Sequence, residues 1–489
     1  MNDPNKVDFE CSAYKEMKQH WPLIHALLAG TQAMRDAGEE FLPKETKETP
    51  KQYKDRLARS ILYGAYADTI TKLASKPFAE AVVIEEMIPE LEGIEENTDG
   101  QGRNITQFAW ECFKAGATYG LTYILVEYPK KVDKNGQVIK RSKAQERALN
   151  EKPYFVHITP PNMIAWKTRR DANGLPVLTE IRFKEKVMVE DGKFGEKVEE
   201  RIRVYTEKDV TVWIKGKDDQ YHPEATIPHT FKNGIPLVPV YFNRDGYMTA
   251  QIPLDRLAWM NLAHWQSLSD QRNILRFSRF ALLMASGFTP NEVKAGFIVG
   301  SNRMIHSTNP EAKIAYVEHT GKAIATGEAD LQSLEARMEV LGLQPLMSNL
   351  GNVLATGQAI NEAKQQSSME SWVRSLEGAL LDAYGMAGIW IGRELKENAK
   401  VEIFSDFSLG LKASEDINAL IAMRKTVPPC ISHETFLKEV KRRGILADTV
   451  DPMKEISAIG EEAPAMGTPI TDEDAGLTGN EGEEGDEEE

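Results

Sequence analysis

A block of strand-like segments between residues 153 and 243 constrains the fold more than any other feature of this sequence. Segments rich in β-branched and aromatic residues follow one another there, separated by turn signals such as DANG and KDDQ. They are YFVHIT, NMIAWK, VLTEIRF, EKVMVE, ERIRVYT, VTVWIKG and PLVPVYF. Such closely spaced strands predict a mostly antiparallel sheet. Because helical periodicity occupies the sequence on both sides, we predict an α+β fold and not an alternating βαβ fold.

Helical spacing precedes the sheet block. Apolar residues recur at helical intervals over 53–79, which predicts one helix that Pro77 brings to an end. A further helix is expected at 105–116, and the run LTYILVEY that follows it is typical of a strand. Residues 1–50 are expected to form short helical pieces, because glycine and proline interrupt them.

A long helix is predicted directly after the sheet block, at 252–283. Pro253 suits its first turn, and Gly287 lies beyond its end. Its centre, SLSDQRN, is polar all round, so it cannot bury a single apolar stripe in the core of its own domain. A helix of this kind bridges solvent or packs against copies of itself.

The rest of the chain predicts a β-rich insert followed by more helices. The insert, 288–325, contains the strand-like segments GFIVG, RMIHS and KIAYVEH, and a helix at 328–341 returns from it. The loop LQPLMSNLGNVLATG then leads into the longest helix, 358–392. A smaller helical unit is expected at 414–447.

The charge of the chain is concentrated at one end. The net charge of the 489 residues is −15, but residues 461–489 hold twelve acidic residues and no basic residue. The remainder carries a net charge of −3, which argues against a protein that binds nucleic acid with high affinity, because such a protein would show a basic excess. The acidic tail is predicted to be a disordered, solvating segment whose removal barely changes folding.

Cysteine usage and hydropathy indicate a reduced, aqueous environment. Cys11, Cys112 and Cys430 are odd in number and far apart, so they favour reduced thiols over a disulfide framework or a cysteine-based zinc site. No apolar run reaches the roughly 18 residues that a membrane helix needs. The length predicts roughly three domains.

A glycine-flanked loop before the longest helix has the layout of a phosphate-binding loop but not its chemistry. Gly351 and Gly357 are separated by five residues where the nucleotide-binding motif has four. Gln358 and Ala359 stand where that motif has lysine and a hydroxyl residue. Without them the loop lacks the charge and the Mg²⁺ ligand of a nucleotide site, so it needs another role.

No local motif indicates catalysis or a metal site. His222, Glu224 and His229 do not follow a zinc spacing and lie in a segment expected to be a proline-interrupted loop. His264 is explained by packing inside the long helix. No nucleophile elbow, zinc-protease motif, kinase set or calcium loop occurs. We therefore predict no catalytic residue, no metal and no cofactor, although a site assembled from distant carboxylates would leave no local trace.

The run IPLDRLAWMNLAHWQSLSDQRNILRFSRFALLMASGF, residues 252–288, resembles the signature of a portal-like group of tailed bacteriophages. That group was long catalogued only as a domain of unknown function. Supporting segments are FLPKETKETPKQYKDRLARS, ILVEYP, ITPPNMIAWK and the ATGQAINEA junction between loop and helix. The resemblance covers most of residues 15–450.

The resemblance implies a series of parts along the chain. They are N-terminal helices with a β-rich wing (1–251), a first stem helix (252–287), a clip (288–326), a second stem helix (327–342), a tunnel loop (343–357), a long wing helix (358–398), a crown (399–450) and an acidic disordered tail (451–489). A polar-centred stem helix fits this scheme if neighbouring subunits surround it in a ring with head-to-tail contacts.

Portal proteins form rings, usually dodecamers of twelve subunits, at one vertex of the phage capsid. The resemblance implies a virion protein, made in the host cytoplasm, that conducts double-stranded DNA without sequence preference during packaging and ejection. Its implied partners are further copies of itself, the terminase large subunit, the head–tail adaptor and the major capsid protein. No membrane and no enzymatic activity are implied.

Two groups of site residues follow from the resemblance. The tunnel loop offers neutral groups able to touch DNA phosphates weakly: Gln344, Ser348, Asn349, Asn352 and Thr356. The clip offers cations for docking the terminase or the adaptor: Lys294, Arg303 and Lys313.

Two other classes of function remain open from the sequence. One is a capsid-associated structural or scaffold protein without a DNA channel, which predicts no closed ring. The other is a metal-dependent nuclease, which predicts Mg²⁺-dependent cleavage of DNA.

Overall fold

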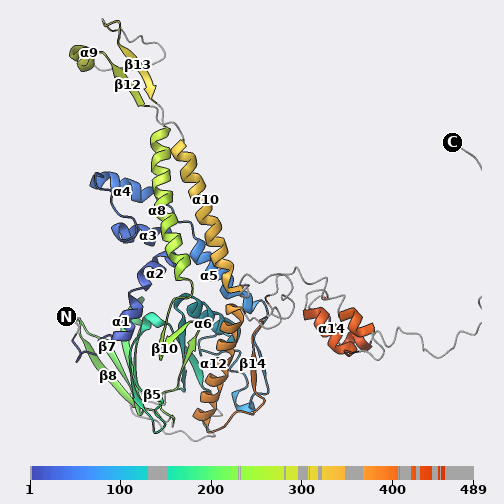
Figure 1. Cartoon of the computed structure of the whole chain (residues 1–489). Coiled ribbons are helices and arrows are strands. Elements are labelled where there is room, and N and C mark those ends of the chain that lie inside the picture. The colour runs from blue at the N-terminus through green and yellow to red at the C-terminus, as the bar shows by residue number, and fades with distance from the viewer. Residues whose placement is uncertain are drawn as a thin grey trace, which may run out of the picture. The chain divides into compact units, whose positions relative to one another are not determined.

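The computed structural model describes residues 3–129, 145, 151–229, 231, 233–279, 282–295, 307, 309–317, 322–346, 367–405, 407, 420–425, 430–442, 446, 450–451 and 453–457. These residues form helices and antiparallel sheets, so the predicted α+β class is confirmed (Figure 1). The chain divides into two compact units, Met1–Asp406 and Phe407–Glu489, and each is described by itself.

Short helices open the first unit. They are α1 (Ser12–Lys18), α2 (Trp21–Ala29), α3 (Thr31–Ala37), α4 (Pro50–Arg59) and α5 (Ala65–Ser75), with 3-10 turns η1 (Gly38–Glu40) and η2 (Lys76–Phe78). Of these helices, α1, α2 and α3 are those predicted for residues 1–50. A capping box fixes the start of α4: the N–H of Gln52 donates to the Thr49 hydroxyl, and the N–H of Thr49 donates to the Gln52 side chain.

The single helix predicted for 53–79 is wrong, because the chain leaves the helix after Arg59 and resumes it at Ala65. The buried side chain of Asn261 bonds the backbone of this break. Its Nδ2 donates to the Tyr63 carbonyl at 2.8 Å, and its Oδ1 accepts the Tyr66 N–H at 3.0 Å. A distant residue therefore replaces the hydrogen bonds that a continuous helix would have made.

A small sheet forms the centre of the first unit. Its order is β3 (Tyr154–Ile158), β2 (Leu121–Glu127) and β9 (Leu237–Tyr241), all antiparallel. All residues of β2 are buried, and α6 (Ile105–Tyr119) and α12 (Ser368–Ile391) pack against the sheet. The complete burial explains why the four apolar residues 123–126 follow one another in β2 without alternation. The predictions of α6 and β2 are confirmed.

The remaining strands of the predicted block form a second, antiparallel sheet in sequence order. Its strands are β4 (Met163–Arg170), β5 (Pro176–Asp191), β6 (Gly195–Thr206), β7 (Asp209–Lys215) and β8 (Tyr221–Pro228). Two predicted segments, VLTEIRF and EKVMVE, merge into the long β5. The prediction of a loop at 222–229 is wrong, because β8 pairs with β7. As an edge strand, β8 tolerates Pro223 and Pro228.

An antiparallel pair of long helices follows the sheets (Figure 1). Helix α8 (Asp255–Ser278) packs against α10 (Lys322–Leu343), where Gln271 Nε2 donates to the Ile324 carbonyl at 2.8 Å. The prediction that the polar centre of α8 packs only against solvent or against other copies of the chain is wrong. Ser269 and Gln271 are buried within the same chain, because Ser269 bonds the Ser60 hydroxyl and Gln271 bonds α10.

A hairpin connects the two long helices. Strand β12 (Leu282–Ser286) pairs with β13 (Lys313–Val317), and α9 (Pro290–Ala295) lies between them in the sequence. The helix predicted to reach residue 283 therefore ends at Ser278, because Leu282 is already paired with Val317. The strand predicted in KIAYVEH is confirmed. The GFIVG segment lies outside the described residues, as does RMIHS except for its last residue.

The described part of the predicted longest helix is α12, which begins after the N-cap Ser367 and ends at Gly392. Its expected first residues, 358–366, lie outside the described residues. Strand β14 (Lys400–Glu402) follows and pairs with β1 (Val83–Glu85). Smaller elements of this unit are the 3-10 turns η3 (Pro89–Leu91), η4 (Pro160–Asn162) and η5 (Gln344–Leu346) and the strands β10 (Arg244–Gly246) and β11 (Thr249–Ala250).

In the second unit, the described residues include helix α14 (His433–Arg442). No described helix of the chain is long and apolar enough to cross a bilayer.

An arginine-lined cleft as the candidate functional site

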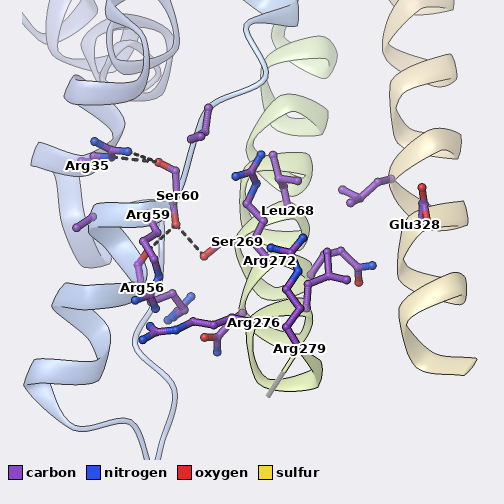
Figure 2. Close-up of a pocket in the computed structure, with 16 residues that line it drawn as sticks. Arg35, Arg56, Arg59, Ser60, Leu268, Ser269, Arg272, Arg276, Arg279 and Glu328 are labelled. Carbon is purple, nitrogen blue, oxygen red and sulfur yellow. Dashed lines mark hydrogen bonds between the residues drawn. The ribbon is translucent and has the colours of Figure 1, made fainter. Parts of the chain in front are cut away.

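A cleft of about 830 Å³ lies between α8, the first half of α10 and the end of α4. Among the described residues that line it, the charged side chains are six arginines and one glutamate: Arg35, Arg56, Arg59, Arg272, Arg276, Arg279 and Glu328. Figure 2 shows the arginines of α8 on one side and those of the α3–α4 region on the other, with Glu328 on α10. We call this group of residues the arginine cleft. The net charge of the chain, which is nearly balanced outside the acidic tail, does not indicate this group of arginines.

The arginines that α8 contributes to the cleft lie on the same face of this helix as its buried residues. Asn261, Trp265 and Leu268 follow each other at intervals of four and three residues, and the first two are fully buried. Arg272, Arg276 and Arg279 continue the same intervals along the same face. One face of α8 therefore changes from core packing to positive charge after Leu268.

The opposite wall begins where α4 ends. The carbonyl of Ser60 accepts two hydrogen bonds from Arg35, from Nε at 3.0 Å and from Nη2 at 2.9 Å. The Ser60 hydroxyl lies 2.9 Å from the hydroxyl of Ser269 on α8, and both serines are buried. These bonds join the break after α4 to α8 and fix the width of the cleft at this point.

Arg56 is neutralised by its own surroundings. Its Nε and Nη2 donate to the two carboxylate oxygens of Glu48, each at 2.9 Å, and Nη2 also donates to the Pro43 carbonyl. Asp270 lies 3.6 Å away. The hydrogen bond to Glu48 raises the pKa of Arg56, and the same bond lowers the pKa of Glu48. Arg56 is therefore a structural cation in an almost fully buried pair.

Four arginines keep their charge available: Arg59, Arg272, Arg276 and Arg279. All four side chains belong to exposed residues, and within the described part of the chain none has a carboxylate within ion-pair distance. Each guanidinium offers five N–H donors in a planar fork that matches phosphate or carboxylate oxygens. The cleft can therefore bind an anion, or a series of anions.

The sequence contained a signal for the three arginines of α8. The intervals of Arg272, Arg276 and Arg279 repeat those of the apolar stripe before them. The second wall could not be predicted, because it depends on the break at Ser60 and on the approach of α4 to α8.

The residues predicted as a tunnel loop and a clip do not line the arginine cleft. Gln344 is exposed in η5, while Ser348, Asn349, Asn352 and Thr356 lie outside the described residues. Lys294 is exposed in α9 and Lys313 is exposed in β13, and Arg303 lies outside the described residues. Lys294 and Lys313 thus belong to the hairpin between the long helices, as expected, and their docking role stays a prediction.

The histidines singled out in the sequence, His222 and His229 as possible metal ligands and His264 as a packed residue, all have contacts within the chain. His222 Nε2 lies 2.9 Å from Asp218, and His229 Nε2 lies 2.9 Å from the Thr206 carbonyl. His264 is buried and lies 3.1 Å from Glu335 of α10. In the described ranges, no group of three or more histidine, cysteine, aspartate and glutamate side chains could hold a metal ion.

One family model matches the part of the first unit that contains the long helices. The model of a family described as a domain of unknown function (DUF4055) matches residues 253–391, which include α8, the hairpin, α10 and α12. No curated protein matches the sequence.

Solved structures similar to this chain include chains of a gene transfer agent particle. A chain of the virion of the native particle has 10% identity and a TM-score of 0.41, with 78% of this chain and 89% of that chain covered. A chain of the neck of the native particle, computed with C12 symmetry, has 9% identity and a TM-score of 0.38 and covers 76% and 88%. A chain of the neck of the empty particle, computed with C6 symmetry, has 9% identity and a TM-score of 0.38 and covers 78% and 89%.

Proposed function

We propose that this chain is a structural protein of the head–neck region of a tailed-phage-like virion, and specifically a portal subunit. In this role it forms a ring at one capsid vertex, through which double-stranded DNA is packaged and ejected. The protein acts by assembly and docking and not as an enzyme. It uses no cofactor.

One observation carries this proposal: the order of α8, the β12–β13 hairpin and α10. A stem helix, a β-rich clip and a returning stem helix are the parts that the portal resemblance implies for this stretch. The hairpin is attached to the C-terminal end of α8 and to the N-terminal end of α10. The family match over 253–391 spans the same elements.

The helix pair also exposes apolar side chains that a ring neighbour would cover. On α8, Trp259 is 56% exposed and Ile274 is 37% exposed, and on α10 Val340 is 62% exposed. Apolar residues of this size on two adjacent helices are typical of a contact surface. A head-to-tail contact repeated by rotation closes into a ring.

The proposed partners follow from the position of each part. The clip, with Lys294, Arg303 and Lys313, would contact the terminase large subunit during packaging and the head–tail adaptor afterwards. The loop after Gln344 would face the DNA channel. The major capsid protein would surround the ring at the vertex.

Imaging of the assembled full-length chain tests the proposal. We expect closed rings with a central channel in negative-stain or cryo-electron micrographs, and a mass by light scattering that fits a ring of about twelve subunits. A monomer, or particles without a closed ring, would sink the portal proposal and favour a capsid-associated protein without a channel. Mg²⁺-dependent DNA cleavage that a single aspartate or glutamate substitution abolishes would favour a nuclease instead.

A further inference from the structure

We propose that the arginine cleft binds the sugar–phosphate backbone of DNA through Arg59, Arg272, Arg276 and Arg279. This inference rests on the proposed function, which brings DNA to the protein. It assigns a DNA contact to a surface formed by α4 and the two long helices, in addition to the loop after Gln344.

Charge balance inside the cleft is the first argument. Arg56 is paired with Glu48, and Arg35 is held by the Ser60 carbonyl, so these two form a fixed wall. The other four arginines are exposed and have no carboxylate partner among the described residues. Like charges held close together repel each other, and a bound anion removes that repulsion.

The spacing of the arginines on α8 is the second argument. Arg272 and Arg276 are separated by about 6 Å of helix rise, and Arg276 and Arg279 by about 4.5 Å. Consecutive phosphates of one strand repeat on the same scale. A phosphodiester chain carries one charge at every repeat, so it can meet each arginine in turn. An acidic polypeptide does so only where its carboxylates recur at a matching interval.

The residue type is the third argument. Among the described residues that line the cleft, the basic ones are all arginines, and none is a lysine. Arginine binds phosphate through two parallel hydrogen bonds and is less strongly hydrated than lysine. A duplex is too wide to enter a cleft of about 830 Å³, so one strand would run across its mouth, where the four long side chains are exposed. Such contacts position DNA without reading its sequence.

The salt dependence of binding gives a quantitative test. Four phosphate contacts predict a slope of about −3.6 for log K against log [NaCl], and two contacts predict about −1.8. Fluorescence anisotropy with a labelled duplex of about 30 base pairs would measure K for the assembled full-length chain between about 50 and 200 mM NaCl.

Three double variants distinguish DNA binding at the arginine cleft from an effect of positive charge elsewhere on the protein. R272Q/R276Q and R59Q/R279Q each remove two of the proposed contacts and should halve the slope. R169Q/R170Q removes two exposed arginines of β4 outside the cleft and should leave the slope unchanged. Thermal unfolding midpoints near that of the unmodified chain would show that all three variants fold.

The outcomes that overturn the inference differ from those that overturn the portal proposal. Unchanged affinity and slope in both cleft variants would refute DNA binding at this site, even if rings form. Tighter binding of polyglutamate than of DNA, lost in R272Q/R276Q, would show a site for an acidic protein segment instead. Loss of rings in the cleft variants without a change in the slope would identify the cleft as a subunit contact. Absence of rings in the unmodified chain would refute only the portal proposal.

Discussion

At the scale of single residues, Gly120 controls the junction between α6 and β2. Its φ of +85° lies in the left-handed region, which side chains other than that of glycine rarely adopt. A Cβ at this position would lie 2.0 Å from the backbone carbonyl oxygen of Gln251. The Gly120 carbonyl also accepts the N–H groups of Phe242 and Asn243, at 2.8 and 2.9 Å. Three chain segments therefore meet at a residue without a side chain.

Substituting Gly120→Ala should lower the free energy of unfolding by at least about 2 kcal/mol, because both the backbone angle and the contact with Gln251 are unfavourable. Gly378→Ala is the matched control, since Gly378 lies inside α12 and nothing is near its missing Cβ. The control should be neutral or gain up to about 1 kcal/mol. Urea unfolding followed by circular dichroism measures both. Equal stabilities of the two variants would contradict the assigned role of Gly120.

The buried side chain of His157 makes the stability of the folded protein depend on pH. Its Nε2 lies 2.7 Å from the Thr122 hydroxyl, between β3 and β2. Burial lowers the pKa of His157 to about 4, with a smaller contribution from the charge of Arg103. The side chain is therefore neutral at pH 7 in the folded protein, whereas in the unfolded chain it takes up a proton near its ordinary pKa.

The low pKa of His157 predicts a loss of stability as the pH falls from about 6.5 towards 4, because the unfolded chain binds the proton first. Between pH 7 and pH 5 this amounts to about 2 kcal/mol. His157→Gln should lose correspondingly less stability over that interval. Denaturant unfolding at pH 7 and pH 5 gives the comparison. A parallel decline in His157→Gln and the unmodified protein would disprove this account.

At the scale of elements, the break between α4 and α5 shows how one long-range contact decides where a helix stops. The apolar spacing of this segment favours a continuous helix. Asn261 of α8 bonds the Tyr63 carbonyl within the break and the Tyr66 N–H in the first turn of α5, and it is fully buried there. Without the break, Ser60 could not bond both Arg35 and Ser269.

Replacing Asn261 by alanine should lower the free energy of unfolding by about 3 kcal/mol, because a buried N–H of Tyr66 and the carbonyl of Tyr63 lose their partner. Asn273→Ala on the same helix should change it by less than about 0.5 kcal/mol. Thermal unfolding and hydrogen exchange of residues 60–66 measure the effect. Unaltered protection of this segment in Asn261→Ala would show that the side chain does not hold the break.

Elements with strong local periodicity were predictable, and elements that depend on distant pairing were not. Helix α6 and strand β2 follow from short sequence windows. The end of α8 depends on β13, because pairing with Val317 makes Leu282 part of a strand. Strand β8 contains prolines that argue against a strand, and only its edge position beside β7 accommodates them.

At the scale of the whole molecule, the hairpin between the long helices is the proposed docking surface. Reversing the charges of Lys294, Arg303 and Lys313 to glutamate should weaken binding of the terminase large subunit roughly tenfold, because opposite charges steer and position the complex. The control reverses Lys193, Lys197 and Lys217 in the five-stranded sheet and its turns, with the same change of net charge. Biolayer interferometry with purified terminase compares the two. Equal binding by both triple variants would count against the clip assignment.

Only part of the candidate site could be predicted from the sequence, because the rest depends on contacts between segments that are distant in the chain. The family resemblance indicated the order of helix, hairpin and helix from the sequence of one continuous stretch. The arginine cleft combines Arg59 with Arg272 and Arg276, which lie far apart along the chain, so no local pattern contains it.

The change along α8 from Trp265 and Leu268 to three arginines also restricts how two copies can meet. If leucines stood at these positions, one apolar seam would run along the helix, and two copies could pair through it about a two-fold axis. With arginines there, such a symmetric pair would place like charges against like charges, which is unfavourable. The three arginines therefore disfavour two-fold dimers of unassembled subunits. Copies of the chain are left to associate through contacts between two different faces.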